Sequence, residues 1–299
     1  MRIGLIFPSF VGEEPDCRFH VERAQQAEEL GFDSVFAGDH LFGHSPNPDP
    51  LAMLAAMAAA TSRITLGTGV LLLALREPAV VAKQVATIDS LCRGRFVLGV
   101  GLGGEMEAEW EAMEIPLRRR GARLDEYLIL LRELWSGKPV DHAGEFRTIR
   151  GVTGSPAPTH LGGPPIWIGG RSDAAVRRAL VHDGWCAYAT SPRTLAKRVS
   201  ELRRIRGGDF VVSAMVFTRL EPSNDAALDG ANEVISAMYR QDFRGLLQSV
   251  GAVGDAAHVA SRLGDFAATG IDEVILCPVV PAASLELQLR TLAEVLLVA

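Results

Sequence analysis

The feature that most constrains the fold is a regular alternation of two kinds of segment along the 299-residue chain. Short runs rich in β-branched and aromatic residues, mostly bounded by turn-forming residues, are typical of buried strands. Longer amphipathic stretches between them are typical of helices that bury one face. The runs predicted to form strands are Ile3–Phe7, Ser34–Ala37, Ile64–Leu72, Phe96–Val100, Ile166–Ile168, Cys186–Tyr188, Phe210–Phe217 and Glu273–Cys277.

The intervening segments predict helices, and several have recognisable ends. The first stops at Gly31, a residue favoured directly after a helix. In another, Leu124, Leu128, Leu131 and Trp135 fall on one face. The predicted helices are His20–Leu30, Leu51–Thr61, Ala79–Leu91, Leu124–Trp135, Ser172–Val181, Pro192–Arg206, Asp225–Val250, Ala256–Ala268 and Ser284–Leu297.

Eight strands that alternate with helices predict a (β/α)8 TIM barrel, formed as a single domain by residues 1–299. An open doubly wound sheet with a second domain is the alternative. One long polar segment rich in Pro and Gly, Asp141–Pro165, lies between the fourth helix and the fifth strand. We expect this insertion to lie near the mouth of the barrel.

Composition excludes several classes of protein. Thirty Lys and Arg against thirty-six Asp and Glu leave a net charge of −6, which argues against nucleic acid or an anionic membrane as the main partner. The longest stretch without charged residues, Gly151–Gly170, contains four prolines and does not predict a membrane-spanning helix. The N-terminus lacks a signal-peptide pattern, so a cytoplasmic location is expected. Four widely spaced cysteines without a C-x-x-C motif predict small buried hydrophobic residues.

A glycine-rich turn follows the fourth strand. The sequence Gly99-Val100-Gly101-Leu102-Gly103-Gly104 fits the G-x-G-x-x-G pattern of dinucleotide sites. Such a pattern normally follows the first strand of a Rossmann domain, whereas three strand–helix units precede it here. We therefore expect Gly101, Gly103 and Gly104 to approach a cofactor phosphate at the barrel mouth, with a plain tight turn as the alternative.

A second turn of this kind follows the fifth strand. Gly169 and Gly170 come directly before Arg171, Ser172 and a helix. Gly170, Arg171 and Ser172 are candidates for binding an anion, because helix N–H groups and a cation would meet there. The alternative is that Ser172 merely caps the helix.

Candidate catalytic side chains follow the second and fourth strands. Asp39 and His40 end the second strand, at the face where barrel enzymes carry their active sites, although a loop turn with a surface histidine is equally consistent. Glu105, Glu107 and Glu109 follow the fourth strand and either lie in solvent near a helix N-terminus or reach the barrel mouth. No motif of zinc-protease, hydrolase or P-loop type occurs, and no metal site is predicted.

Together these segments resemble the luciferase-like monooxygenase superfamily over nearly the whole chain. The superfamily includes bacterial luciferase, FMN-dependent monooxygenases and enzymes that use the deazaflavin coenzyme F420. The order and spacing of the motifs, rather than any one of them, carry the resemblance. These motifs are Ala27–Ser34, Asp39-His40, Ile64–Val70, Arg76–Pro78, Gly94–Gly101, Arg120–Tyr127, Pro164–Gly170, Arg177-Arg178 and Asp183–Trp185.

The resemblance implies a flavin or deazaflavin ring at the carboxyl end of the barrel, with the Asp-His pair pointing to the F420 branch. It implies that Asp39 and His40 flank the ring and that the catalytic glutamate is Glu105 or Glu109. Relatives carry a bulge with a non-proline cis peptide after the third strand, which places such a bond at Gly69–Val70 as a backstop for the ring. Leu41-Phe42-Gly43 follows His40, where sugar-phosphate dehydrogenases of this branch have a tryptophan that packs on the ring.

We therefore expect an oxidoreductase that exchanges hydride between F420 and a small organic substrate. His40 would donate or accept a proton, and Asp39 would orient it. The alternative is a two-component monooxygenase that uses reduced FMN from a separate reductase together with O₂. A non-catalytic barrel that binds a cofactor or a partner and an NAD-dependent Rossmann enzyme are more distant alternatives. Relatives are often dimers, so a homodimer is expected.

Overall fold

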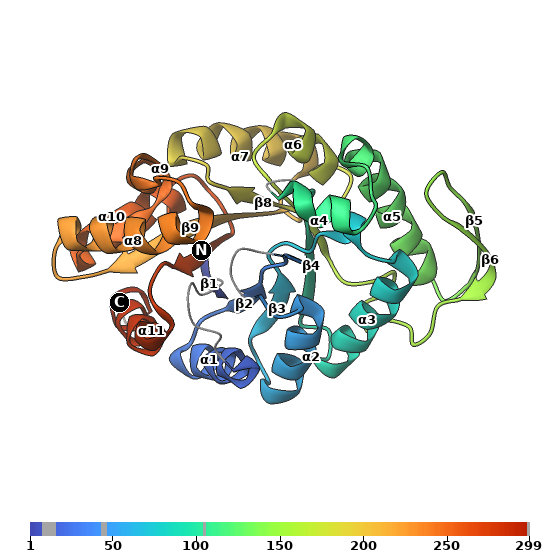
Figure 1. Cartoon of the computed structure of the whole chain (residues 1–299), viewed down its shortest axis with the longest axis horizontal. Coiled ribbons are helices and arrows are strands. Elements are labelled where there is room, and N and C mark those ends of the chain that lie inside the picture. The colour runs from blue at the N-terminus through green and yellow to red at the C-terminus, as the bar shows by residue number, and fades with distance from the viewer. Residues whose placement is uncertain (8–15, 43–46, 104–105, 298–299) are drawn as a thin grey trace.

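Eight parallel strands close into a barrel in the computed structural model, which describes residues 1–7, 16–42, 47–103 and 106–297 (Figure 1). Each strand pairs with the next in the order β9-β11-β1-β2-β3-β4-β7-β8, and β8 pairs back to β9 to close the ring. The strands are β1 (Arg2–Phe7), β2 (Ser34–Ala37), β3 (Thr65–Thr68), β4 (Phe96–Val100), β7 (Ile166–Gly169), β8 (Gly184–Tyr188), β9 (Val211–Leu220) and β11 (Glu273–Pro278). The predicted barrel and all eight of its strands are confirmed.

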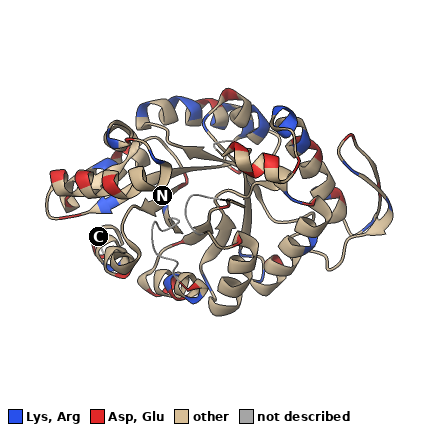
Figure 2. Ribbon diagram, viewed as in Figure 1, with Lys and Arg blue, Asp and Glu red and all other residues tan. Residues whose placement is uncertain are grey.

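Helices form a ring around these strands, and most of the charged residues belong to the helices of that ring (Figures 1 and 2). Gly31 ends the first helix with φ of 95°, a left-handed conformation that residues other than glycine rarely adopt. The helices are α1 (Cys17–Leu30), α2 (Pro50–Ala60), α3 (Pro78–Leu91), α4 (Glu107–Ala112), α5 (Arg120–Leu134), α6 (Asp173–Ala179), α7 (Pro192–Arg206), α8 (Asn224–Tyr239), α9 (Arg244–Val250), α10 (Ala256–Ala267) and α11 (Ala282–Leu296), with 3₁₀ turns η1 (Leu73–Leu75) and η2 (Leu117–Arg119).

Two apolar clusters hold the fold together. The larger one packs the outer faces of the strands against the helices. The smaller one includes Ile6, Phe36 and Trp167 from the strands, together with residues of α8 and α9. Because alternate residues of a strand face opposite sides, this second cluster forms the floor beneath the carboxyl end of the barrel.

Three local expectations were wrong. β3 ends at Thr68 rather than Leu72, and the chain beyond it rejoins the sheet only through a bridge between Leu71 and Val100. The segment predicted as one helix from residue 225 to 250 is divided into α8 and α9, because Arg240 caps α8 with φ of 56°. Cys17 is exposed at the start of α1, whereas the other three cysteines are buried as predicted.

The insertion after α5 forms an antiparallel hairpin of β5 (Pro139–Ala143) and β6 (Thr148–Thr153), which projects beyond α5 (Figure 1). The Glu126 carboxylate on α5 fixes it by accepting backbone N–H bonds from Glu145, Phe146 and Arg147. A further short strand, β10 (Ala252–Gly254), extends the sheet beyond β9. The sequence patterns predicted none of these three strands.

The described part of the chain contains neither a helix able to span a membrane nor a metal-binding cluster. None of its helices has both the length and the apolar character that crossing a bilayer requires. It also holds no group of three or more His, Cys, Asp or Glu side chains arranged to hold a metal ion.

Candidate active site at the carboxyl end of the barrel

A cavity of about 430 Å³ opens at the carboxyl ends of the barrel strands. Residues that end or follow seven barrel strands line it, from Phe7 of β1 to Val279 after β11, and α8 contributes a further side. Its size is in the usual range for a small-molecule site, and it lies where barrel enzymes carry their active sites.

His40 lines this cavity, and the Glu109 carboxylate contacts its Nδ1 atom and orients the imidazole. The first turn of α4 places Glu109 fully buried, with one carboxylate oxygen 3.3 Å from His40 Nδ1. The other oxygen accepts the Phe42 backbone N–H at 3.1 Å. A carboxylate beside Nδ1 favours the tautomer with a proton on Nδ1, which leaves Nε2 as the nitrogen free to act as a base.

Asp39 does not orient His40, so that expectation is wrong. Its buried carboxylate accepts the Leu72 backbone N–H at 2.9 Å and two bonds from the Arg76 guanidinium at 2.7 and 3.1 Å. Arg76 also pairs with Asp49. Burial opposes the charge of Arg76, but the two carboxylates outweigh it and raise the pKa of the guanidinium. Asp39 therefore ties the end of β2 to the segment after β3, which fixes two walls of the cavity.

The peptide bond between Gly69 and Val70 is cis, as the resemblance implied. Val70 lines the cavity and points its side chain against the glycines that follow the neighbouring strands. A Cβ at Gly101 would lie 2.3 Å from one Val70 methyl carbon, and a Cβ at Gly169 would lie 2.5 Å from the other. Gly99 is equally restricted, because its Cβ would meet the Thr68 carbonyl oxygen. The glycine pattern after β4 thus makes room for the chain beyond β3.

Three arginines line one side of the cavity: Arg120 at the start of α5, Arg171 after β7 and Arg178 on α6. The Arg120 Nε is buried and has no partner among the described residues, whereas Arg178 pairs with Asp125. In the turn after β7, which was predicted to bind an anion, two of the expected groups have partners within the protein. The Gly170 N–H donates to the Cys186 carbonyl, and the Ser172 hydroxyl caps α6 by accepting the Ala175 N–H. The arginine side chains thus give this side of the cavity its positive charge.

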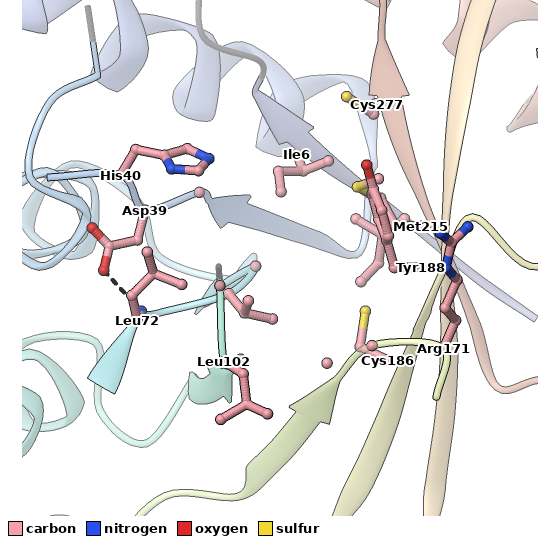
Figure 3. Close-up of a pocket in the computed structure, with 18 of the residues that line it drawn as sticks. Ile6, Asp39, His40, Leu72, Leu102, Arg171, Cys186, Tyr188, Met215 and Cys277 are labelled. Carbon is pink, nitrogen blue, oxygen red and sulfur yellow. Dashed lines mark hydrogen bonds between the residues drawn. The ribbon is translucent and has the colours of Figure 1, made fainter. Parts of the chain in front are cut away.

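A further side of the cavity, which begins at β8 next to Arg171, was not predicted from the sequence. It consists of apolar, aromatic and sulfur-containing side chains on β8, β9, β11 and α8, several of which Figure 3 draws together. The alternation of inward residues along each strand is a signal for those on strands, but it does not distinguish the cavity from the core below it. The members are Cys186, Tyr188, Met215, Phe217, Val234, Ile235, Met238, Tyr239, Ile275, Cys277 and Val279.

Most of the predicted site residues line the same cavity. Asp39, His40, Gly69, Val70, Gly101, Gly103, Gly170, Arg171 and Ser172 all line the cavity. Glu109 does not line it and contacts His40 instead, while Gly104 and Glu105 lie outside the described residues. No described residue of the insertion between Asp141 and Pro165 lines the cavity.

Sequence comparison relates this chain to flavin-type and deazaflavin-type enzymes. A family model described as luciferase-like monooxygenase matches residues 1–273. An uncharacterized protein of Mycobacterium tuberculosis is 32% identical over 218 residues, which cover 66% of this chain and 75% of that protein. The F420-dependent glucose-6-phosphate dehydrogenase of Microbacterium testaceum is 38% identical over 161 residues, which cover 51% of this chain and only 47% of the dehydrogenase.

Solved structures share the fold over the full length of the chain. The monooxygenase RslO1 from Streptomyces bottropensis superposes with a TM-score of 0.85 at 24% identity, covering 99% of both chains. An F420-dependent secondary alcohol dehydrogenase in complex with an F420-acetone adduct gives 0.83 at 20% identity, covering 99% of this chain and 98% of that one. The FMN-bound oxygenating component of 3,6-diketocamphane monooxygenase from Pseudomonas putida gives 0.78 at 18% identity, covering 98% and 97%.

Proposed function

The chain belongs to the luciferase-like monooxygenase family, and we propose that it is an oxidoreductase that exchanges hydride between F420 and a small organic substrate. The observation that carries the proposal is His40, which lines the cavity with its Nδ1 held by the buried Glu109 carboxylate. The curated relatives named as F420-dependent dehydrogenases, at 37–40% identity over about half of this chain, favour F420 over FMN.

The residues that line the cavity fit a deazaflavin cofactor. Val70 and Leu102 present flat apolar surface for a ring, and the glycines around Val70 keep this wall clear of side chains. The unpartnered Nε of Arg120, together with Arg171, would hold the anionic part of the cofactor. When bound, F420 supplies a two-electron hydride carrier that reacts poorly with O₂.

His40 handles the proton that accompanies hydride transfer. With the Nδ1 proton directed to Glu109, Nε2 accepts a proton from a substrate hydroxyl during oxidation and returns it during reduction of a carbonyl group. Glu109 stabilises the imidazolium that this produces and keeps the ring in place. Asp39 and Arg76 act only by fixing the neighbouring loops.

Replacing His40 tests this role. At saturating F420, His40→Ala is expected to lower turnover by about 10²–10⁴-fold, the usual contribution of a general acid or base. The dissociation constant of F420 should change by less than about threefold, because His40 is one of many residues that line the cavity. Turnover within threefold of the wild-type value, with weakened cofactor binding, would make His40 a seating residue for the cofactor instead.

The FMN monooxygenase alternative keeps the same fold and cavity but requires O₂ and a reductase. The reductase and the homodimer both stay predictions. The mass of the protein in light scattering decides the assembly, because a dimer has twice the 32.1 kDa of one chain.

A further inference from the structure

The side of the cavity formed by β8, β9, β11 and α8 carries no charged side chain among the described residues that line it. Met215 and Phe217 come from β9, and Cys186 and Tyr188 come from the adjacent β8. We call this set, together with the α8 and β11 residues given above, the apolar wall. Figure 3 shows Tyr188 and Met215 across the cavity from His40.

The two thiols of the apolar wall add no charge. Burial raises the pKa of Cys186 to about 11 and that of Cys277 to about 12. Both sulfurs are therefore neutral at physiological pH and behave as small apolar groups. The Tyr188 ring packs edge-on against Phe217 with centroids 6.2 Å apart, so an aromatic pair forms part of the same surface.

Helix α8 extends the apolar wall away from the strands. Val234, Ile235, Met238 and Tyr239 lie three and four residues apart, which places them on one face of the helix. Met215 and Met238 are flexible and polarisable, so this surface can fit hydrocarbon groups of different shape.

Among the described residues that line the cavity, no Lys or Arg comes from β9, β11 or α8, whereas Arg171 lies beside β8, where the Gly170 N–H donates to the Cys186 carbonyl (Figure 3). Arg120, Arg171 and Arg178 belong to the segments that follow β4 and β7, and Arg178 is already paired with Asp125. A phosphate or carboxylate placed against the β9, β11 and α8 part of the apolar wall would lose its hydration with no Lys or Arg among the described lining residues there to pair with it, which is strongly unfavourable.

We infer that the substrate is an uncharged alcohol or carbonyl compound with a hydrocarbon part that packs on the apolar wall, and that it is not a sugar phosphate. This inference rests on the proposed hydride exchange with F420. The polar group of the substrate lies toward His40, while the arginine side serves the anionic cofactor. The chain thus differs in substrate class from the glucose-6-phosphate dehydrogenases that it matches in sequence.

A homologous series tests the inference. The 2-alkanols from propan-2-ol to octan-2-ol are assayed beside glucose 6-phosphate in the presence of F420. The corresponding ketones are titrated calorimetrically with and without cofactor. Because each buried methylene contributes about 0.8 kcal/mol, kcat/KM and ketone affinity are expected to rise about fourfold per added methylene. Glucose 6-phosphate should neither bind nor react.

A charged substitution in the apolar wall provides the matched comparison. Met215→Lys is expected to reduce kcat/KM for octan-2-ol and the affinity for octan-2-one by more than about tenfold. Val181→Lys adds the same charge at a side chain that is 77% exposed and lies outside the cavity, and it should leave both values unchanged. If Met215→Lys does not fold, the dependence of ketone affinity on the length of the ketone, measured with the wild-type protein, still decides whether the inference holds.

The outcomes separate this inference from the proposed function. If F420 binds but glucose 6-phosphate is the better substrate, or affinity is independent of chain length, the inference is overturned and the proposed function stands. If F420 does not bind while ketone affinity still rises with chain length, the proposed function fails and the apolar substrate class is supported. If neither the ketones nor the alkanols bind under any condition, the inference is overturned.

Discussion

The contact between Val70 and the glycine turn after β4 gives a sharp prediction for Gly101→Ala. The added Cβ would lie 2.3 Å from one Val70 methyl carbon and 3.3 Å from Val70 Cβ. Carbon atoms in favourable contact are about 3.5–4.0 Å apart, so Val70 or the turn must move by more than about an ångström. Gly101 is not among the glycines with positive φ, so the penalty arises from this overlap rather than from backbone conformation.

Overpacking of this kind costs about 1–3 kcal/mol of unfolding free energy. Urea denaturation measures it as a lower midpoint with an unchanged slope, and cofactor titration should show weakened binding because Val70 lines the cavity. Gly38→Ala is the matched control, because its Cβ would meet only the Gly69 carbonyl oxygen, at 4.0 Å. This control should stay within about 0.5 kcal/mol of the wild-type value.

A double substitution tests the physical cause. Val70→Ala removes the methyl carbon at 2.3 Å and leaves only Val70 Cβ, at 3.3 Å, so the cost of Gly101→Ala should fall below about 0.5 kcal/mol in the Val70→Ala background. A Gly101→Ala protein as stable as the wild type, or a cost that is the same in both backgrounds, would refute the packing explanation. The glycine would then serve close approach of a ligand to the backbone, as the sequence pattern suggested.

Two further substitutions test individual carboxylates. Asp39→Asn should lower the unfolding free energy by about 1.5–3 kcal/mol, because the half-buried Arg76 loses the charge of its buried partner, and it should change turnover by less than about tenfold. Unchanged stability with a large loss of turnover would contradict the structural role of Asp39. Burial raises the pKa of Glu28, but backbone N–H bonds from Ile64, Arg63 and Ser62 outweigh it and lower the pKa to about 2. The unfolding free energy that this lowered pKa contributes is fully present above about pH 4.5 and is lost as the pH falls toward 2. Glu28→Gln should therefore lower the unfolding free energy by about 1–2 kcal/mol at pH 7, allowing for solvent screening, and by nearly nothing at pH 2. A loss that is independent of pH in urea titrations would contradict this.

The sequence predicted correctly those features that depend on residues close together along the chain. The eight strands follow from short apolar runs and turn residues, and the position of His40 follows from the end of β2. The partner of His40 was assigned incorrectly because consecutive residues at a strand end point in opposite directions. Asp39 consequently turns to Leu72 and Arg76, while His40 turns to Glu109, which lies 69 positions further along the chain.

Features that depend on the register between distant segments could not be predicted. The fit of Val70 against Gly101 and Gly169 exists only because β3, β4 and β7 are neighbours at matching heights in the barrel. The apolar wall combines β8, β9 and β11 with α8, and the end of α8 depends on a left-handed arginine that no local pattern marks. Both features belong to the closed barrel rather than to any single strand or helix.

Equilibrium titration of the purified protein with F420 and with FMN, each oxidised and reduced, tests the central claim most directly. Cofactor fluorescence and calorimetry give the dissociation constants under identical conditions, and Arg120→Gln tests whether the guanidinium with the unpartnered Nε holds the anionic part. The account predicts that F420 binds at least about tenfold more tightly than FMN, and that Arg120→Gln weakens F420 binding. Tighter binding of FMN, with reduced FMN consumed in the presence of O₂, would contradict it and identify the chain as a flavin monooxygenase.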